Sequence, residues 1–275
     1  MYKRLKLFFI SISILILIVS CNFYTNSNST GEFDLGVDIP EENYTDLDYI
    51  ADLGLMRGHL VAAKELLDTG SPGQAQYHLA HPLEELYAQI EPVLKKQGID
   101  TGKFHNSLEQ LYETAEFKPY NQATKDRFSE AVNNIQSAID KFFEKNPQSG
   151  EFVEKVFLSI LETSAEEYGA GIGVNCKIIA PIEYQDSYGF VKYVKEELSR
   201  ASWVSDTTRE KFKPIVKELL VAWSPGEPPK NTTNNNLDCS IALSSVGNQP
   251  SVYPPEYPVM TGEKVSSLVE NISIQ

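Results

Sequence analysis

Residues that carry most protein chemistry are scarce in this sequence. Its 275 residues include three cysteines, four histidines and two tryptophans, and 24 Lys and Arg stand against 38 Asp and Glu, a formal charge of −14. Nucleic-acid binding depends on basic side chains that neutralise phosphates, so this balance excludes a nucleic-acid partner. The excess of acid is compatible with cationic partners, including metal ions, or with ordinary solubility.

Recognised catalytic motifs are also absent. The sequence contains no Gly-x-Ser-x-Gly, no His-Glu-x-x-His and no phosphate-binding loop. The glycine run at 169–173 follows a helical pattern, whereas a dinucleotide-binding loop follows a strand. The sequence therefore favours a non-catalytic function, although scattered catalytic groups leave an enzyme open.

Long apolar runs are missing except near the N-terminus. Leu7 to Val19 is apolar apart from two serines, and Lys3, Arg4 and Lys6 precede it. Since a membrane-spanning helix needs about 20 apolar residues, this run is too short to span a bilayer. It fits a signal peptide over residues 1–20.

The signal peptide ends in Ile18-Val19-Ser20-Cys21, which resembles the lipobox of bacterial lipoproteins. The resemblance implies that Cys21 carries diacylglycerol and fatty-acyl chains such as palmitate, so that the lipid holds the chain on a membrane of the cell envelope. Asn22 replaces the Asp that marks inner-membrane retention, which favours the outer membrane, facing the periplasm. A plain secretory signal or an uncleaved anchor is the alternative.

Composition divides the mature chain into three parts. Residues 21–44 are mostly polar and predict a flexible tether. Residues 45–223 predict a helical domain, and residues 224–275 form a Pro/Asn-rich irregular region in which 241–246 and 265–274 can add a short strand or helix. Removal of residues 1–20 takes away three basic residues and no acid, which leaves 21 basic and 38 acidic residues and a formal charge of −17.

Two cysteines remain beyond the lipidation site, Cys176 in an expected loop and Cys239 in the irregular region. An exported chain can oxidise such a pair. A disulfide would fix the C-terminal region to the helical domain. The sequence leaves the bonded and the free forms equally open.

Helical periodicity runs through the central domain. Pro82 and Pro92 should kink or restart the second helix, and the glycine run at 169–173 should end the fifth. We expect helices at 46–69, 71–97, 101–117, 122–145, 150–168, 181–201 and 206–223. The connections are short, which favours antiparallel neighbours. The predicted fold is an all-α antiparallel bundle of about six or seven helices with an irregular C-terminal tail.

Acidic residues fall on apolar helix faces at two matching positions. The apolar face of 150–168 continues to Glu167, and that of 181–201 runs back to Glu183, with Asp186 one turn later at its edge. The two helix ends meet at one level in an antiparallel hairpin. Because two buried carboxylates repel each other, a bound cation would stabilise them.

Histidines occupy a second candidate site. His59 lies within the broad apolar face of the first helix, and His78 and His81 are spaced as neighbours on the second. Histidines and carboxylates on facing helices build sites for iron, manganese or zinc in helical bundles. The Glu-x-x-His pair of di-iron bundles is absent. Acids at helix ends hydrogen-bonded to tyrosines or amides, and a satisfied core histidine, are the alternatives.

Two stretches of sequence resemble known helical regions. Leu53 to Leu60, with His78-x-x-His81-Pro82 and Glu84 to Tyr87, is similar to a domain of uncharacterised bacterial envelope proteins. Glu166-Glu167-Tyr168 with Glu183-Tyr184-Gln185-Asp186 is similar to helical periplasmic regions associated with iron permeases. The resemblances imply a helical periplasmic fold, a divalent metal or iron as ligand, and an envelope transport partner.

Two functions follow from these patterns. The first is an envelope-anchored helical lipoprotein that binds a solute, such as a metal ion, through buried carboxylates and histidines. The alternative is an envelope scaffold or partner-binding lipoprotein whose buried acids only fix its packing.

Overall fold

A computed structural model describes residues 44–173, 177–224, 230–231, 237–238, 250–255 and 258–273. The signal peptide, Cys21, nearly all of the tether, Cys176, Cys239 and residues 241–246 lie outside the described residues. The lipidation and disulfide assignments therefore stay predictions.

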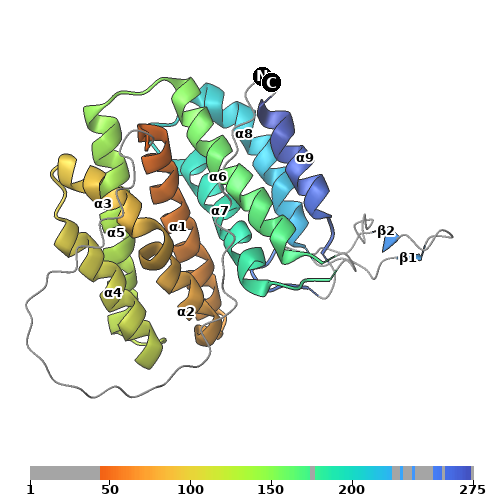
Figure 1. Cartoon of the computed structure of the whole chain (residues 1–275), viewed down its shortest axis with the longest axis horizontal. Helices are drawn as coiled ribbons and strands as arrows, with labels where there is room; N and C mark the ends of the chain where they lie inside the picture. Colours follow the sequence, from red (N-terminus) through yellow and green to blue (C-terminus); the bar gives the residue numbers. More distant parts are fainter. Residues whose placement is uncertain are drawn as a thin grey trace, which may run out of the picture. The chain divides into compact units, whose positions relative to one another are not determined.

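The described part of the chain is an all-α bundle, as the periodicity predicts (Figure 1). Its α-helices are α1 (Asp46–Asp68), α2 (Pro72–His81), α3 (Tyr87–Lys96), α4 (Thr101–Phe117), α5 (Gln122–Lys145), α6 (Gly150–Gly171), α7 (Pro181–Arg200), α8 (Asp206–Leu219) and α9 (Gly262–Ser273). A 3-10 turn, Leu220–Trp223, continues α8. Two short antiparallel strands, β1 (Lys230–Asn231) and β2 (Leu237–Asp238), pair with each other.

Helix α1 is the centre of the bundle. Thr45 caps it, since the Thr45 side chain accepts from the Asp48 amide and the Asp48 carboxylate accepts from the Thr45 amide. Most of its circumference is buried, and it packs against α2, α5, α6 and α7. Figure 1 shows it between the α4–α5 hairpin and the α6–α7 hairpin.

Pro82 changes the helical geometry without ending the helix. Residues Pro82–Leu86 form a π-helical segment between α2 and α3. Proline has no amide proton to donate to the preceding turn, and such segments accommodate the lost bond. The kink expected at Pro82 is therefore a local widening of the helix, which begins one residue after His81. Pro92 lies inside α3, which continues through it.

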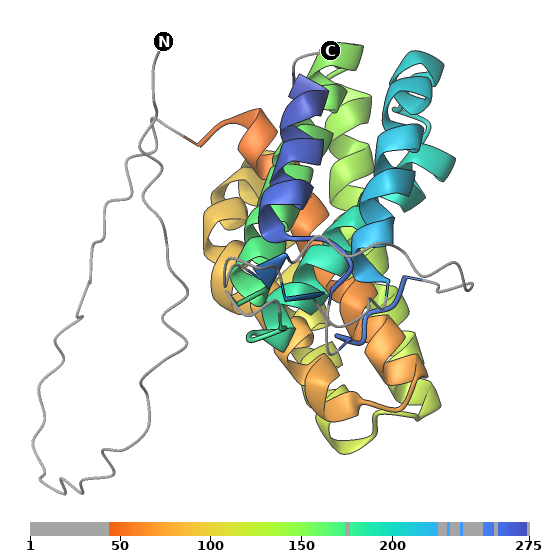
Figure 2. The same cartoon turned by 90° about the vertical axis from the view of Figure 1, so that its right-hand side faces the viewer.

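The end of the described chain adds a further helix to the bundle. Helix α9 packs against α6 (Figure 2) and buries Val265, Val269 and Ile272. A helix was one of the two alternatives for this segment. The Tyr168 hydroxyl donates to the backbone carbonyls of Ala222 and Met260, which ties the tail to the core.

Among the described helices, none combines the length and the hydrophobicity that a membrane-spanning segment needs.

Two glycines allow α1 and α7 to cross in backbone contact. A Cβ atom on Gly189 would lie 3.0 Å from the carbonyl carbon of Gly58, and one on Gly58 would lie 3.0 Å from the Cα atom of Phe190. Both positions therefore require glycine. The crossing places His59, which follows Gly58 on α1, against Asp186, which lies one turn before Gly189 on α7.

Candidate metal centre

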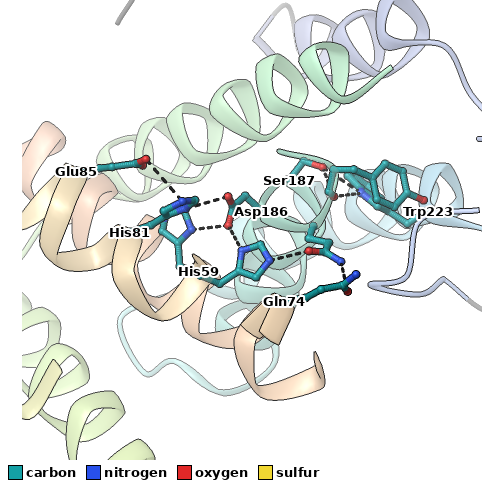
Figure 3. Close-up of polar contacts among 10 residues, drawn as sticks. His59, Gln74, His81, Glu85, Asp186, Ser187 and Trp223 are labelled. Atoms are coloured by element: carbon teal, nitrogen blue, oxygen red, sulfur yellow. Dashed lines mark hydrogen bonds and ion pairs between the residues drawn. The ribbon is translucent and has the colours of Figure 1, made fainter. Parts of the chain in front are cut away.

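Four chemically reactive side chains meet where α1, α2 and α7 come together. His59 comes from α1, His78 and His81 come from successive turns of α2, and Asp186 comes from the first turns of α7. One ligand atom from each lies within 4.8 Å of every other. Figure 3 shows His59 and His81 pointing toward Asp186.

The Asp186 carboxylate is the centre of the cluster. Its Oδ1 atom lies 2.5 Å from Nδ1 of His59 and 2.7 Å from Nδ1 of His78. Its Oδ2 atom lies 3.1 Å from Nδ1 of His81. That last pair lacks hydrogen-bond geometry, and Nδ1 of His81 is buried with no hydrogen-bond partner. Three imidazole nitrogens therefore converge on one carboxylate.

Burial differs among the four residues. The side chains of His59 and Asp186 are 4% and 5% exposed, and that of His78 is fully buried. His81 is 17% exposed. The cluster is thus buried, and His81 is its most exposed member.

Electrostatics keep the cluster charged. Burial acts to raise the pKa of Asp186, but His59 and His78 outweigh it and hold that pKa well below its usual range. Burial acts to lower the pKa of His81, but Asp186 and then Glu85 outweigh it and raise that pKa to about 9. The protein therefore holds an ionised carboxylate in its interior, and this carboxylate requires positive charge around it.

A chain of two glutamines fixes the orientation of His78. The Gln185 amide donates from Nε2 to Oε1 of Gln74 (3.1 Å), so its own Oε1 faces Nε2 of His78 at 2.8 Å. Nε2 of His78 therefore carries a proton and donates it. In neutral His78 the lone pair is then on Nδ1, which faces Asp186. A proton or a cation between Nδ1 and the carboxylate removes the resulting repulsion.

The residue after Asp186 anchors α7 to the rest of the bundle. The Ser187 backbone carbonyl accepts from Ser164 Oγ of α6 at 2.8 Å. Ser187 Oγ accepts from Nε1 of Trp223 at 3.1 Å, and the same Trp223 atom lies 3.1 Å from the Tyr184 carbonyl (Figure 3). These buried bonds hold the first turns of α7, and with them Asp186, in a fixed register.

The two glutamates singled out in the sequence lie outside the four-residue cluster. Both are half-buried, whereas Glu166 is exposed as expected from its place on the helix. Burial raises the pKa of Glu167 to about 8, and the negative charges of Asp186, Glu183 and Glu85 add to it. Glu167 therefore lies within electrostatic range of the cluster.

The structure combines residues that the sequence patterns placed in two groups. Asp186, expected beside Glu167 and Glu183, lies with the three histidines, and Glu167 and Glu183 stand apart from them. Gln74 and Gln185 were not predicted as residues of the site. Their signal was present, because Gln74 precedes His78 by one helical turn and Gln185 adjoins Asp186.

The donor set suits a borderline transition metal. Three imidazoles and one carboxylate are ligands that zinc, iron, copper and nickel accept. Calcium and magnesium require mostly oxygen ligands, and Cu(I) prefers sulfur. Of the ligand nitrogens, Nδ1 of His81 has no hydrogen bond, and Nδ1 of His78 presents its lone pair when the ring is neutral. The residues present therefore fit a divalent ion.

Comparison with known proteins finds a match to a family model over part of the chain. Residues 144–238 match the family model of the iron permease-associated 4-helix bundle domain. The match covers α6, α7 and α8, so Asp186, Glu167 and Glu183 lie inside it and the three histidines lie outside. No curated protein and no solved structure matches the chain. The chain thus carries a helical segment similar to a domain associated with iron permeases.

Proposed function

We propose that this chain is an envelope lipoprotein whose helical domain binds a divalent transition metal at His59, His78, His81 and Asp186. Lipid on Cys21 would hold this domain at the membrane surface, and the metal would be cargo exchanged with an envelope transport partner. The metal favoured is iron(II), because of the similarity to an iron permease-associated domain.

One observation carries the proposal: three imidazole Nδ1 atoms converge on a single buried carboxylate, within 3.1 Å. Buried histidines normally satisfy both ring nitrogens with separate partners. Here all three Nδ1 atoms face the same carboxylate, and that of His81 meets it as an ion pair without a hydrogen bond. A cation among these atoms would accept all the nitrogen lone pairs and neutralise the carboxylate.

Supporting contacts also favour a metal. Metal-bound histidines usually donate their second ring nitrogen to a fixed acceptor, which sets the tautomer and the ring orientation. His78 has such a contact, from Nε2 to Gln185 Oε1. The acceptor is itself held by Gln74. These contacts are the ones that a metal-bound His78 would need.

The alternative function is an envelope scaffold in which the cluster is only a hydrogen-bonded network. The raised pKa of His81 favours this alternative, because a protonated imidazole compensates the charge of Asp186 without a metal. In that case Asp186 would contribute to stability and to nothing else. The two functions differ in whether a metal ion stabilises the folded protein.

The test is anaerobic calorimetric titration of the mature chain with Fe²⁺, and with Zn²⁺ in parallel. The expected result is one tight site, with protons released as metal displaces them from the histidines. His59→Ala should abolish it, whereas His105→Ala, which changes the half-exposed histidine of α4, should leave it intact. Equal metal binding by both variants would show that His59 is not part of a metal site.

Mass spectrometry of the membrane-extracted protein tests the lipid on Cys21.

A further inference from the structure

A metal that binds among His59, His78, His81 and Asp186 must first reach these buried side chains. The route described below rests on the proposed function. We propose that Glu167 forms an outer cation position through which the metal passes on its way to the buried site. The negative charges of Glu85 and Glu183 act on this position as well. Glu167 is then a residue that controls exchange rather than a permanent ligand.

Differences in exposure define the route. His59, His78 and Asp186 are at least nine-tenths buried, and His81 is the most exposed of the four. Its Nε2 atom lies 3.9 Å from Oε1 of Glu85, whose side chain is 48% exposed. A cation from solvent therefore arrives past Glu85 and His81, and meets Nδ1 of His81, which is buried without a hydrogen bond.

The packing of α6 on α7 places Glu167 at this side of the cluster. Ser164 bonds to the carbonyl of Ser187, and a Cβ atom on Gly171 would lie 3.2 Å from Tyr184. Residues 164, 167 and 171 share one helical face, so Glu167 lies between these contacts, level with the first turns of α7. The pKa of Glu167, raised to about 8 by burial and by three neighbouring acids, agrees with this position.

No lysine or arginine neutralises Glu167 or Glu183 in the described part of the chain, and the basic group that acts on Glu167 is His81. Within the described ranges, no Lys or Arg forms an ion pair with Glu167 or Glu183, and the ion pair of Glu85 is with His81. Glu154 differs from them in this respect, since it pairs with Lys211. Carboxylates such as Glu167 and Glu183, which are half-buried and have no Lys or Arg partner, raise the local concentration of metal ions and speed their association.

The test is stopped-flow absorbance of Co²⁺ binding to the full mature chain, followed through the visible bands of the bound ion. Glu167→Gln should slow association by about fivefold or more, within the range that local charge provides. Dissociation should slow by a similar factor, since the ion leaves by the same route. The equilibrium affinity should change less than either rate.

The matched control is Glu166→Gln, which removes the same charge from the neighbouring exposed position. It should leave both rates within about twofold of the unmodified protein, because exposed charges are screened. Equal rates for Glu167→Gln and Glu166→Gln would overturn the inference. A lower affinity with unchanged association in Glu167→Gln would also overturn it, since Glu167 would then be a permanent ligand.

The two proposals fail in different ways. If the unmodified chain gives no Co²⁺ bands, and neither Fe²⁺ nor Zn²⁺ binds in calorimetry, the proposed function fails. If the chain binds Co²⁺ and the Glu167 variant behaves as the control, only the access route fails.

Discussion

Nδ1 of His59 lies 2.5 Å from Oδ1 of Asp186, although 127 residues separate them in the chain. The contact joins the central helix α1 to the start of α7 at the point where these helices cross. Asp186 is also the residue shared by the histidine cluster and by the segment similar to an iron permease-associated domain. Substitutions of Asp186, and of the residues that hold the site around it, therefore test the proposed metal binding.

Asp186→Asn should remove metal binding and keep the fold. Asparagine has the same shape and can accept from an imidazole, but it brings no charge to the cation. Affinity should fall by more than about 100-fold, beyond the roughly 10–100-fold effect of residues that only support a ligand. Calorimetry measures the affinity, and circular dichroism checks the helices. Asp140→Asn, at an exposed site of α5, should change neither.

Gln185→Leu should weaken metal binding by about 10–100-fold, because His78 loses the acceptor that holds its Nε2 proton and its ring orientation. The variant keeps all four proposed ligands. The measurement is competition with a chelator of known affinity. Gln89→Leu, at an exposed site of α3, serves as the control. An unchanged affinity in Gln185→Leu would mean that the glutamine chain serves packing alone.

Gly189→Ala should both destabilise the protein and weaken the site. The added methyl group meets the backbone of Gly58, which cannot move aside as a flexible side chain can. Overpacking of this kind costs about 1–3 kcal/mol, which lowers the melting temperature by several degrees. Gly169→Ala in α6 is the control, because its Cβ atom would have no neighbour within 4 Å. Equal melting temperatures for the two variants would contradict the close approach of α1 and α7.

Asp52 makes stability depend on pH. Burial raises its pKa to about 6, opposed by a hydrogen bond that it accepts from the Tyr44 hydroxyl and assisted by the charge of Asp48. Because the folded-state pKa lies above the unfolded value of 3.8, the stabilising contribution is complete below pH 3.8 and is lost as pH rises through 6.

Asp52→Asn removes the buried charge and should therefore stabilise the protein at neutral pH more than in acid. The melting temperature of the variant, relative to the unmodified chain, should rise by about 2 °C or more between pH 4 and pH 7.5. Differential scanning calorimetry across this range measures the effect. If the difference in melting temperature between the two proteins is constant with pH, the Asp52 carboxyl has the same pKa in the folded and unfolded states.

The helices themselves were predictable from local signals. Hydrophobic periodicity and capping residues gave α4 and α5 with their observed ends, and α1 within one residue. Helix α6 differs, since it continues through Gly169 to Gly171. Gly171 is buried against Tyr184 and the Ala180 carbonyl, so packing on α7 outweighs the low helix propensity of the glycine run.

The site was predictable in its residues and not in its grouping. Asp186, His59, His78 and His81 each stood out as polar groups on or beside apolar faces. Their meeting depends on how α1 crosses α7, and the contact between Gly58 and Gly189 sets that crossing. Helical periodicity gives the face of one helix but no distance between two helices, so Asp186 could only be assigned to its neighbour in sequence, Glu183.

Elemental analysis of the mature protein, purified without a tag from its own host and without added metal, shows whether the cluster of His59, His78, His81 and Asp186 holds a metal. We expect about one equivalent of a transition metal per chain, with iron favoured, and we expect Asp186→Asn to lose it. A protein that carries no metal and gains no thermal stability from added Fe²⁺ or Zn²⁺ would contradict this expectation, as would equal metal content in the Asp186→Asn variant.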